Sequence, residues 1–362
     1  MSGITSSEST RYGPDVYFLV LPGTMLLDFA GTSETLRVAA DYGASFRIHY
    51  VGPSDLPRTS IGLALQGVEP LPPRLPAGAI VIIPGVEKSA RDYRRPEARQ
   101  AVEWLARSVS SNHLLCTVCS GVFLAAESGL LENHVCTTHH SLTGRLAREY
   151  PRLHVVENRI FVRDRNVLTS AGVTAGVDLA LQLVSELAGP LVAVEAARLL
   201  VLYFRRAGSD PQLSAWLLHR NHIDPRVHGA QDLVVRDPAH DWTIPELARR
   251  VYTSPRHLDR LFQAFAGISP LAYLRKIRVA TARELLREPG ASVEKVAETV
   301  GFSSAEQLRR ACRRFERARP RDLRTPPPSG TPDPEGSLLG REGVARATPA
   351  RLKSARQRAA GP

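Results

Sequence analysis

Continuous apolar runs and amphipathic segments alternate along the first half of the chain. The apolar runs, which are typical of strands buried on both faces, are 16–21, 48–51, 79–83 and 113–118. Helical periodicity instead marks residues 26–40, 95–108 and 175–187. Two short apolar pairs, 161–162 and 167–168, flank four polar residues and predict a hairpin. Strands that alternate with helices predict a three-layer α/β domain over residues 14–190.

The pattern is helical throughout residues 232–324, and this part contains an internal repeat. Residues 244–251 resemble 293–300 at an offset of 49, and beyond the next turn the offset becomes 50. Each copy is a short helix with a small central Ala, then a tight turn and a second helix. The amphipathic segment 270–286 predicts one long helix between the copies. Two helix-turn-helix units on a rigid spacer suit successive major grooves of DNA.

The second helix of each copy has one apolar face. In the first copy Ser254 is expected as the N-cap, followed by a proline in the first turn. The residues expected to be buried there are Leu258, Leu261, Phe262 and Phe265. In the second copy Ser303 or Ser304 is expected as the cap, and Leu308 is expected to point inward.

The opposite faces carry the predicted DNA contacts, because Arg can pair with guanine and Gln with adenine in a major groove. For the first copy they are Ser254, Arg256, His257, Asp259 and Arg260. For the second copy they are Ser304, Glu306, Gln307, Arg309 and Arg310. Further arginines expected to hold phosphates are Arg313, Arg314, Arg317 and Arg319. The competing interpretation is a helical bundle with an ordinary basic surface.

Charge is concentrated towards the end of the chain. The net charge is +1 over residues 1–231, +7 over 232–324 and +3 over 325–362, within a total of +11. A localised basic module favours a polyanionic partner, although a solvated surface could carry the same charge. Residues 1–13 and the low-complexity tail 325–362 are predicted to be disordered, and 191–231 to be a connector.

Composition favours a cytoplasmic protein. The first residues hold no positive cluster and no apolar run, so no signal peptide is predicted. No apolar stretch reaches the length of a membrane span, and no membrane partner is expected. Four cysteines are too few for a disulfide scaffold and fit a reducing compartment.

A cysteine at the end of an apolar strand is the most suggestive chemical feature of the first domain. The strand 113–118 leads to Cys119, Ser120 and Gly121 turn the chain, and a helix follows. A cysteine on such an elbow lies at a helix N-terminus, where the dipole favours the thiolate. Cys116 completes a Cys-x-x-Cys pattern, but no second Cys/His pair supplies zinc ligands. We therefore predict no metal and no cofactor.

Residues 240–324 resemble the AraC/XylS family of regulators. The matching text is IPELARRVYTSPRHLDRLFQAFAGISPLAYLRKIRVATARELL, then VEKVAETVGFSSAEQLRRACRRF and RPRDLR. The resemblance implies that the exposed recognition-helix faces contact DNA, which points to Arg256, Asp259, Arg260, Glu306 and Arg310. Three departures follow from comparing the copies: Cys312 stands where the first has Phe262, Arg317 where it has Gly267, and Leu323 where it has Tyr273. The second unit is therefore expected to be looser.

Residues 15–187 resemble the class I amidotransferase-like superfamily that includes PfpI-type proteins and isocyanide hydratases. The supporting stretches are 26–31 with Glu34, then 83–85, 118–121, 137–139 and 168–180. The resemblance implies a flavodoxin-like sheet, an elbow cysteine facing a small pocket, and frequent dimerisation. PfpI-type proteases have His after the cysteine and isocyanide hydratases have Thr, whereas this chain has Ser120.

Three roles are open for this first domain: a ligand sensor, a retained enzyme or a structural dimerisation module. If it were active, Cys119 would be the nucleophile and Asp28 the general acid/base. As a sensor it would bind a small effector through Cys119, Ser120, Asp28, Glu34 and His139. Glu34 could equally be a solvated helix residue, and His139 a polar residue at a strand end.

The sequence thus predicts a two-domain transcription regulator of the GlxA-like branch of the AraC family, and not an enzyme. Its expected partners are double-stranded DNA, a small effector and a second copy bound through the N-terminal domain, with RNA polymerase as a further partner open to such a regulator. The alternative is an isocyanide hydratase-like enzyme with a DNA-binding appendage. A nonspecific DNA-coating protein is a third class, and it would show equal affinity for all sequences.

Overall fold

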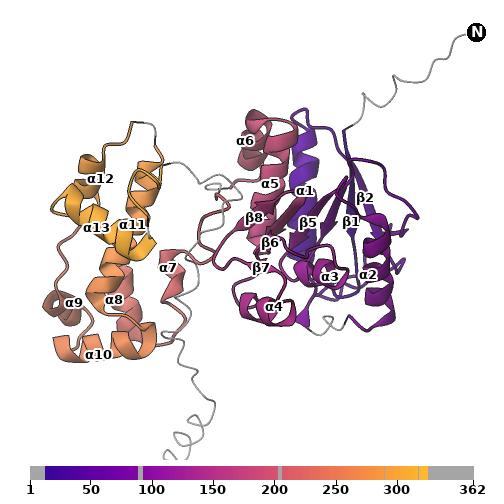
Figure 1. The fold of residues 1–362 in the computed structure, drawn as a ribbon. Coiled ribbons are helices and arrows are strands. Elements are labelled where there is room, and N and C mark those ends of the chain that lie inside the picture. Colours follow the sequence, from indigo (N-terminus) through magenta and orange to yellow (C-terminus); the bar gives the residue numbers. More distant parts are fainter. Residues whose placement is uncertain (1–12, 89–92, 203–205, 289, 317, 325–362) are drawn as a thin grey trace, which may run out of the picture. The chain divides into compact units, whose positions relative to one another are not determined.

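The computed structural model describes residues 13–88, 93–202, 206–288, 290–316 and 318–324 (Figure 1). These residues form two units, one ending at Leu213 and the other beginning at Ser214. Residues 1–12, the basic tail 325–362 and Arg317, for which the sequence made predictions, lie outside the described residues.

A seven-stranded sheet with the order β3-β2-β1-β4-β5-β9-β8 forms the centre of the first unit. Its strands are β1 (Asp15–Leu19), β2 (Arg47–Gly52), β3 (Glu69–Pro70), β4 (Ile80–Ile83), β5 (Leu114–Val118), β8 (Phe161–Asp164) and β9 (Val167–Ser170). β8 pairs with β9 in antiparallel fashion, which confirms the predicted hairpin, and the other neighbours are parallel. A separate ladder joins β6 (Val135–Cys136) to β7 (His154–Val155).

Helices cover both faces of this sheet. The helices of one face are α1 (Leu26–Ala40), α5 (Thr174–Leu187) and α6 (Pro190–Leu199). The helices of the other face are α2 (Pro96–Ser108), α3 (Gly121–Glu127) and α4 (Thr143–Glu149). Along β1, Val16 and Phe18 enter the first of these cores and Tyr17 and Leu19 the second. This burial on both faces confirms the predicted three-layer, flavodoxin-like fold.

The predicted connector 191–231 is divided between the two units. Helix α6 packs against α5 and α1, and Gly208 accepts a hydrogen bond from the backbone N–H of Ile160 at 2.9 Å. Both segments therefore belong to the first unit. From Ser214 onwards the chain packs into the second unit, where Trp216 and Val227 join its core.

The second unit is entirely helical. Its helices are α7 (Ala215–Leu218), α8 (Pro225–Arg236), α9 (Ile244–Arg250), α10 (Pro255–Ala266), α11 (Pro270–Leu286), α12 (Val293–Thr299) and α13 (Ala305–Glu316). One core lies between α8, α9, α10 and the first half of α11, and a second lies between the rest of α11, α12 and α13. The predicted linking helix is confirmed as α11. No helix among the described residues is long and apolar enough to cross a membrane.

Local signals place the ends of these helices. The hydroxyl of Ser254 accepts from the backbone N–H of His257 at 3.3 Å, which confirms the predicted N-cap. Gly267 ends α10 with φ +69°, a left-handed conformation that suits glycine. The prediction that Phe265 is buried was wrong, because 44% of this residue is exposed. Its ring lies against that of His222 in a tilted arrangement, 6.1 Å between centroids.

Candidate DNA-binding surface and elbow-cysteine site

The first helix-turn-helix unit consists of α9 and α10. Ala248 is fully buried between these helices, and its small side chain allows their close approach. The turn is closed by a hydrogen bond from the backbone N–H of Thr253 to the carbonyl of Ala248, 2.9 Å long. Tyr252 in this turn has φ +54° and is 93% exposed. Tyr252 was not among the predicted contact residues, although an aromatic residue in a turn between two periodic helices is a usable signal.

The predicted contact residues of α10 do not all face solvent equally. Arg256 and Arg260 are exposed, as is Gln263 one turn further on, whereas Asp259 and His257 are half-buried. The two ring nitrogens of His257 lie 3.3 Å from Arg226 of α8 and 2.9 Å from Arg260. A neutral imidazole can accept from only one guanidinium at a time, so His257 is held among cations at the side of the helix.

The outer face of α13 is a mixed but predominantly basic surface. Ser304 caps the helix, accepting from the backbone N–H of Gln307 at 3.3 Å. The carboxylate of Glu306 lies 3.6 Å from Arg310 and 3.7 Å from Arg309. Arg309 also reaches Glu294 of α12, 3.3 Å away.

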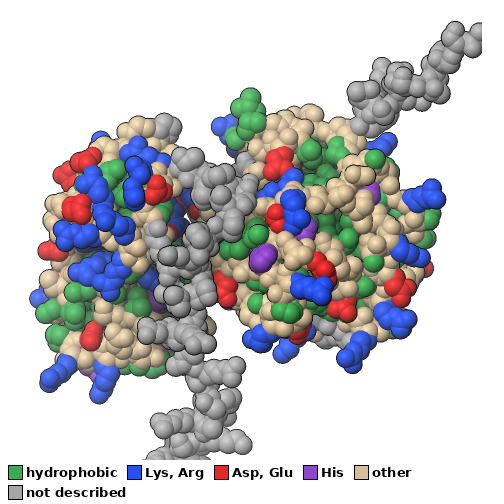
Figure 2. Space-filling model, viewed as in Figure 1, with side chains coloured by type: hydrophobic (Ala, Val, Ile, Leu, Met, Phe, Trp, Pro, Cys, Tyr) green, Lys and Arg blue, Asp and Glu red, His purple; other side chains and the backbone are tan. Residues whose placement is uncertain are grey.

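Of the contact residues predicted in α13 and at its cap, Arg309 is half-buried and the others are exposed, as are Arg313 and Arg314 one turn later. The side chain of Arg310 is 74% exposed although it pairs with Glu306. Figure 2 shows many Lys and Arg side chains gathered over this unit.

The elbow cysteine occupies the expected place in the first unit. Cys119 follows the carboxyl end of β5, has φ +55° and is buried. Its carbonyl accepts a hydrogen bond of 2.7 Å from the hydroxyl of Thr138. Gly172 makes the elbow possible, because a Cβ added there would lie 2.2 Å from the Cβ of Cys119. The chain therefore approaches the cysteine so closely that a side chain is excluded.

Asp28 faces this elbow from the first turn of α1. Its fully buried carboxylate accepts from the backbone N–H of Val173 at 2.5 Å and from that of Gly85 at 3.2 Å. A Cβ on Gly85 would lie 2.5 Å from Asp28 Oδ2 and 3.0 Å from the Cβ of Cys119, so both side chains converge on this glycine. Val173 is held at φ +52°, an unfavourable conformation for a β-branched residue. Backbone strain of this kind concentrates at functional sites.

The remaining predicted site residues lie apart from this pair or are engaged with the backbone. The Ser120 hydroxyl exchanges two hydrogen bonds of 2.9 Å with the backbone of Val86, so it supports the elbow. Glu34 is exposed and pairs with Arg37 at 2.8 Å, on a different part of α1 from Asp28. His139 follows Thr138 and lies half-buried, its Nδ1 2.8 Å from the Ser141 hydroxyl.

The second cysteine of the Cys-x-x-Cys pattern lies inside β5. Burial raises the pKa of Cys116 to about 12, so its thiol stays protonated at neutral pH. Among the described residues, no group of three or more His, Cys, Asp or Glu side chains is arranged to hold a metal ion.

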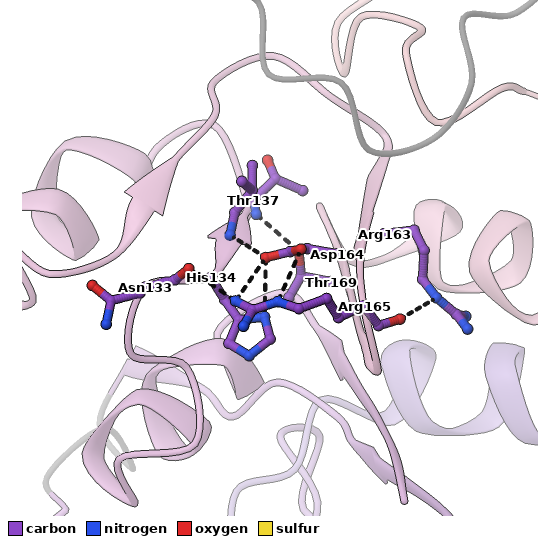
Figure 3. Close-up of polar contacts among 8 residues, drawn as sticks. Asn133, His134, Thr137, Arg163, Asp164, Arg165 and Thr169 are labelled. Carbon is purple, nitrogen blue, oxygen red and sulfur yellow. Dashed lines mark hydrogen bonds and ion pairs between the residues drawn. The ribbon is translucent and has the colours of Figure 1, made fainter. Parts of the chain in front are cut away.

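A polar network at the β8–β9 hairpin positions the segment that contacts the elbow (Figure 3). Asp164 Oδ2 accepts from the backbone N–H of Val135 at 2.8 Å and lies 3.0 Å from His134 Nδ1. Burial, and then the charge of Arg165, lower the pKa of His134, although the neighbouring Asp164 acts in the opposite direction. Two residues after Val135, the backbone N–H of Thr137 donates to the hydroxyl of Thr169 at 2.8 Å. These contacts fix the strand that leads to Thr138 and thereby the carbonyl of Cys119.

A concavity of about 420 Å³ lies beside this network, lined by residues that include His134, Arg165 and Asn166. It borders the amino ends of β5 and β9, whereas Cys119 follows the carboxyl end of β5. The two places are thus at opposite ends of the same strands.

Comparison with known proteins supports both halves of this description. Residues 14–186 match the DJ-1/PfpI family, and residues 247–325 match a helix-turn-helix domain. The chain is 30% identical to the HTH-type transcriptional regulator CdhR of Pseudomonas aeruginosa, over 88% of this chain and 95% of that protein. It is also 30% identical to the HTH-type transcriptional regulator GlxA of Rhizobium meliloti, over 89% and 98%. An isonitrile hydratase of Pseudomonas putida is 29% identical over 54% of this chain and 79% of its own length.

Proposed function

Since the chain belongs to the HTH-type transcriptional regulators that join a DJ-1/PfpI domain to an AraC-type helix-turn-helix domain, we propose that it reads DNA with the exposed faces of α10 and α13. The first unit then serves as a sensor that binds a small effector and pairs two copies of the chain.

The observation that carries the DNA-reading part is the repeated geometry of α10 and α13. Each helix begins at a serine N-cap, buries a leucine and presents arginines on its outer face. The charge that favours a polyanion is localised in the same unit. Nonspecific coating of DNA would need only the charge, whereas paired recognition helices also supply base-reading groups.

We assign Arg256 and Arg260 to base edges in the DNA segment read by α10, which we call the first box, with Tyr252 beside them. In the segment read by α13, the second box, we assign Gln307 and Arg310. We assign Glu306 a different role, because its carboxylate neutralises and orients neighbouring arginines instead of reaching DNA.

The test is selection of random duplex DNA by the full chain, followed by affinity measurements on the selected site. Removing a bidentate Arg–guanine pair costs about 1–3 kcal/mol, so Arg260→Ala should weaken binding roughly tenfold and relax one base position. Arg99→Ala removes the same charge from an exposed position of α2 in the first unit and is the matched control. Equal affinity of the wild type for all sequences would overturn the proposal.

We place the effector at the convergence of Asp28, Gly85 and Cys119. The backbone N–H groups of Gly85 and Val173 orient the carboxylate, and Cys119 and Val173 both have a strained, positive φ. Glu34 is not part of this assignment, because it faces solvent with Arg37.

A thermal-shift screen of small metabolites against the wild type and Cys119→Ala would identify ligands of this site. Ser111→Arg, which changes an exposed residue lining the concavity at the opposite end of the strands, is the control variant. A ligand whose effect is lost only in Ser111→Arg would move the sensor site to that concavity.

The resemblance to an isonitrile hydratase makes retained catalysis a measurable alternative. We infer that the elbow senses a ligand without turnover, because the relatives that match nearly the whole chain are transcriptional regulators, whereas the isonitrile hydratase matches 54% of it. Hydration of an isonitrile by the wild type that disappears in Cys119→Ala would refute this inference.

For pairing of two copies, the exposed apolar face of α6 is our candidate. Leu191, Val194 and Leu199 are 79%, 42% and 50% exposed there. Glu195 and Arg198 lie among them, and an antiparallel second copy would bring each opposite its counter-charge across a two-fold axis. Light scattering should show a dimer for the wild type and a monomer for Leu191→Glu. A dimer that persists in Leu191→Glu would place the interface elsewhere.

A further inference from the structure

The two cores of the DNA-binding unit meet at one residue of α11. Ile277 belongs to the core of the first helix-turn-helix unit and Val279 to the core of the second. Arg278 lies between them and is only 8% exposed. A buried guanidinium at the junction of two apolar cores needs polar partners, because desolvation of the charge is unfavourable.

Those partners come from both sides of the junction. The Nε of Arg278 donates to the carbonyl of Pro238 at 2.7 Å and its Nη2 to the carbonyl of His240 at 2.9 Å, in the loop before α9. On the other side, the guanidinium carbon lies 5.8 Å from the ring centroid of Phe302, in the turn between α12 and α13.

The same loop touches the second turn directly. Gly301 has φ +85°, and a Cβ added there would lie 2.5 Å from the carbonyl oxygen of Ala239. The turn of the second helix-turn-helix unit is therefore packed against the loop that precedes the first one. Only glycine permits both the conformation and the close approach.

The loop itself is anchored to the first core. The backbone N–H of His240 donates to Asp237 Oδ1 at 3.1 Å, and the indole N–H of Trp242 donates to the carbonyl of Asp237 at 2.8 Å. Trp242 is buried in the first core. A displacement of the second unit would therefore have to break contacts to a loop that the first unit holds in place.

We propose that Arg278, the carbonyls of Pro238 and His240, and Phe302 form a clasp that fixes the second recognition helix relative to the first. The clasp restrains bending and twisting of α11, and so it sets the separation at which two DNA boxes can be bound together. This inference rests on the proposed reading of DNA by α10 and α13.

Arginine suits the position because its planar fork donates along two directions while its face lies against an aromatic ring. Lysine has the same charge but no flat face, and its single nitrogen cannot reproduce this arrangement. Arg278→Lys therefore tests the geometry of the clasp and Arg278→Met tests its charge and hydrogen bonds. Arg275→Met, on the exposed side of the same helix, is the matched control.

The experiment is selection by the full chain from a duplex library in which the box read by α10 and the box read by α13 are separated by variable spacers. For the wild type and Arg275→Met we expect one preferred spacing. For Arg278→Lys and Arg278→Met we expect the same two boxes at a broader range of spacings. The affinity of these variants at the wild-type spacing should fall about tenfold. A hydrogen bond from a charged group, such as that of Arg278 to a carbonyl, contributes a stabilisation that corresponds to roughly this factor. Affinity for a single first box should change less than about twofold.

Phe302→Leu provides a second variant, which keeps the burial but removes the ring face, and it should broaden the spacing to a smaller extent. An unchanged preferred spacing in the Arg278 variants and in Phe302→Leu would overturn the clasp while leaving the DNA-reading function intact. A wild type that selects no motif, or only a single box, would overturn both. Loss of binding to the single first box in the Arg278 variants would show that Arg278 supports folding of the first unit and would contradict its assignment to the clasp.

Discussion

Leu258 and Leu308 occupy equivalent positions in the two helix-turn-helix units, and truncating each to Ala compares how well the two cores are packed. Both side chains are fully buried. Around Leu258 the core includes Phe262 and Tyr273, whose rings pack at 6.2 Å between centroids. The second core has smaller side chains at the matching positions, where Cys312 is buried and Leu323 is partly buried.

The size of the effect depends on how far the surroundings collapse into the space that is vacated. Replacing a buried leucine by alanine lowers the free energy of unfolding by roughly 3–5 kcal/mol in a rigid core. Where the neighbouring side chains can relax into the space, the loss is roughly 2–3 kcal/mol. Aromatic rings are large and hold their positions, so we expect the larger loss of unfolding free energy for Leu258→Ala. The smaller side chains of the second core should reduce the loss for Leu308→Ala.

Hydrogen exchange of the backbone amides of α10 and α13, in the full chain, is the suitable assay. Tryptophan fluorescence would not report on the second core, because Trp104 lies in the first unit and Trp216 and Trp242 lie at the first core of the second unit. Gln263→Ala, on the exposed face of α10, is the control and should leave protection in α10 within about 0.5 kcal/mol of the wild type. A loss of protection in Leu308→Ala as large as that in Leu258→Ala would refute the unequal packing.

Three further predictions concern other parts of the chain. Gly85→Ala should disturb the elbow, because its Cβ would lie 2.5 Å from Asp28 Oδ2. Urea unfolding should show that it lowers the free energy of unfolding of the first unit by roughly 1–3 kcal/mol. Gly144→Ala, where the nearest contact of an added Cβ is 3.6 Å, should leave that free energy unchanged. Burial, and then Lys276, lower the pKa of His219 below 6.5, so the folded state binds a proton less readily than the unfolded one. Urea unfolding followed by fluorescence should show stability falling as the pH drops below about 6.5, and His219→Gln should flatten that slope; an unchanged slope would exclude His219. Burial raises the pKa of both Cys116 and Cys136 to about 12, so mass spectrometry after iodoacetamide treatment of the native protein at pH 8 should find neither alkylated.

The long periodic elements were predictable from the spacing of their apolar residues, and α11 also from a local signal at its start. The predicted segments 26–40 and 270–286 coincide with α1 and α11, and the second begins at a serine cap followed by proline. The two-residue strands β3, β6 and β7 have no periodicity to detect, since their pairing is decided by tertiary contacts. The true extent of the connector could not be predicted from the hydrophobic pattern either. Helix α6 packs on α5 through alanines, which are common in any helix and do not mark a buried face.

Only part of the functional site could be inferred from local sequence. The elbow at Cys119 follows from a strand, a turn and a helix, and its pairing with Asp28 came from the family resemblance. Glu34 lies six residues along α1 from Asp28 and points to a different side, which the resemblance alone did not reveal. Arg278 looked like one more charged residue on an amphipathic helix, because its partners lie about 40 residues before it and 24 after it.

Hydroxyl-radical footprinting of the full chain on its selected site tests the central claim most directly, namely that α10 and α13 read DNA as a fixed pair. We predict two protected patches on one face of the duplex, about one helical turn or 34 Å apart. Arg260→Ala should weaken one patch and Arg310→Ala the other. Uniform protection that does not depend on sequence, or a single patch unaffected by Arg310→Ala, would contradict the account.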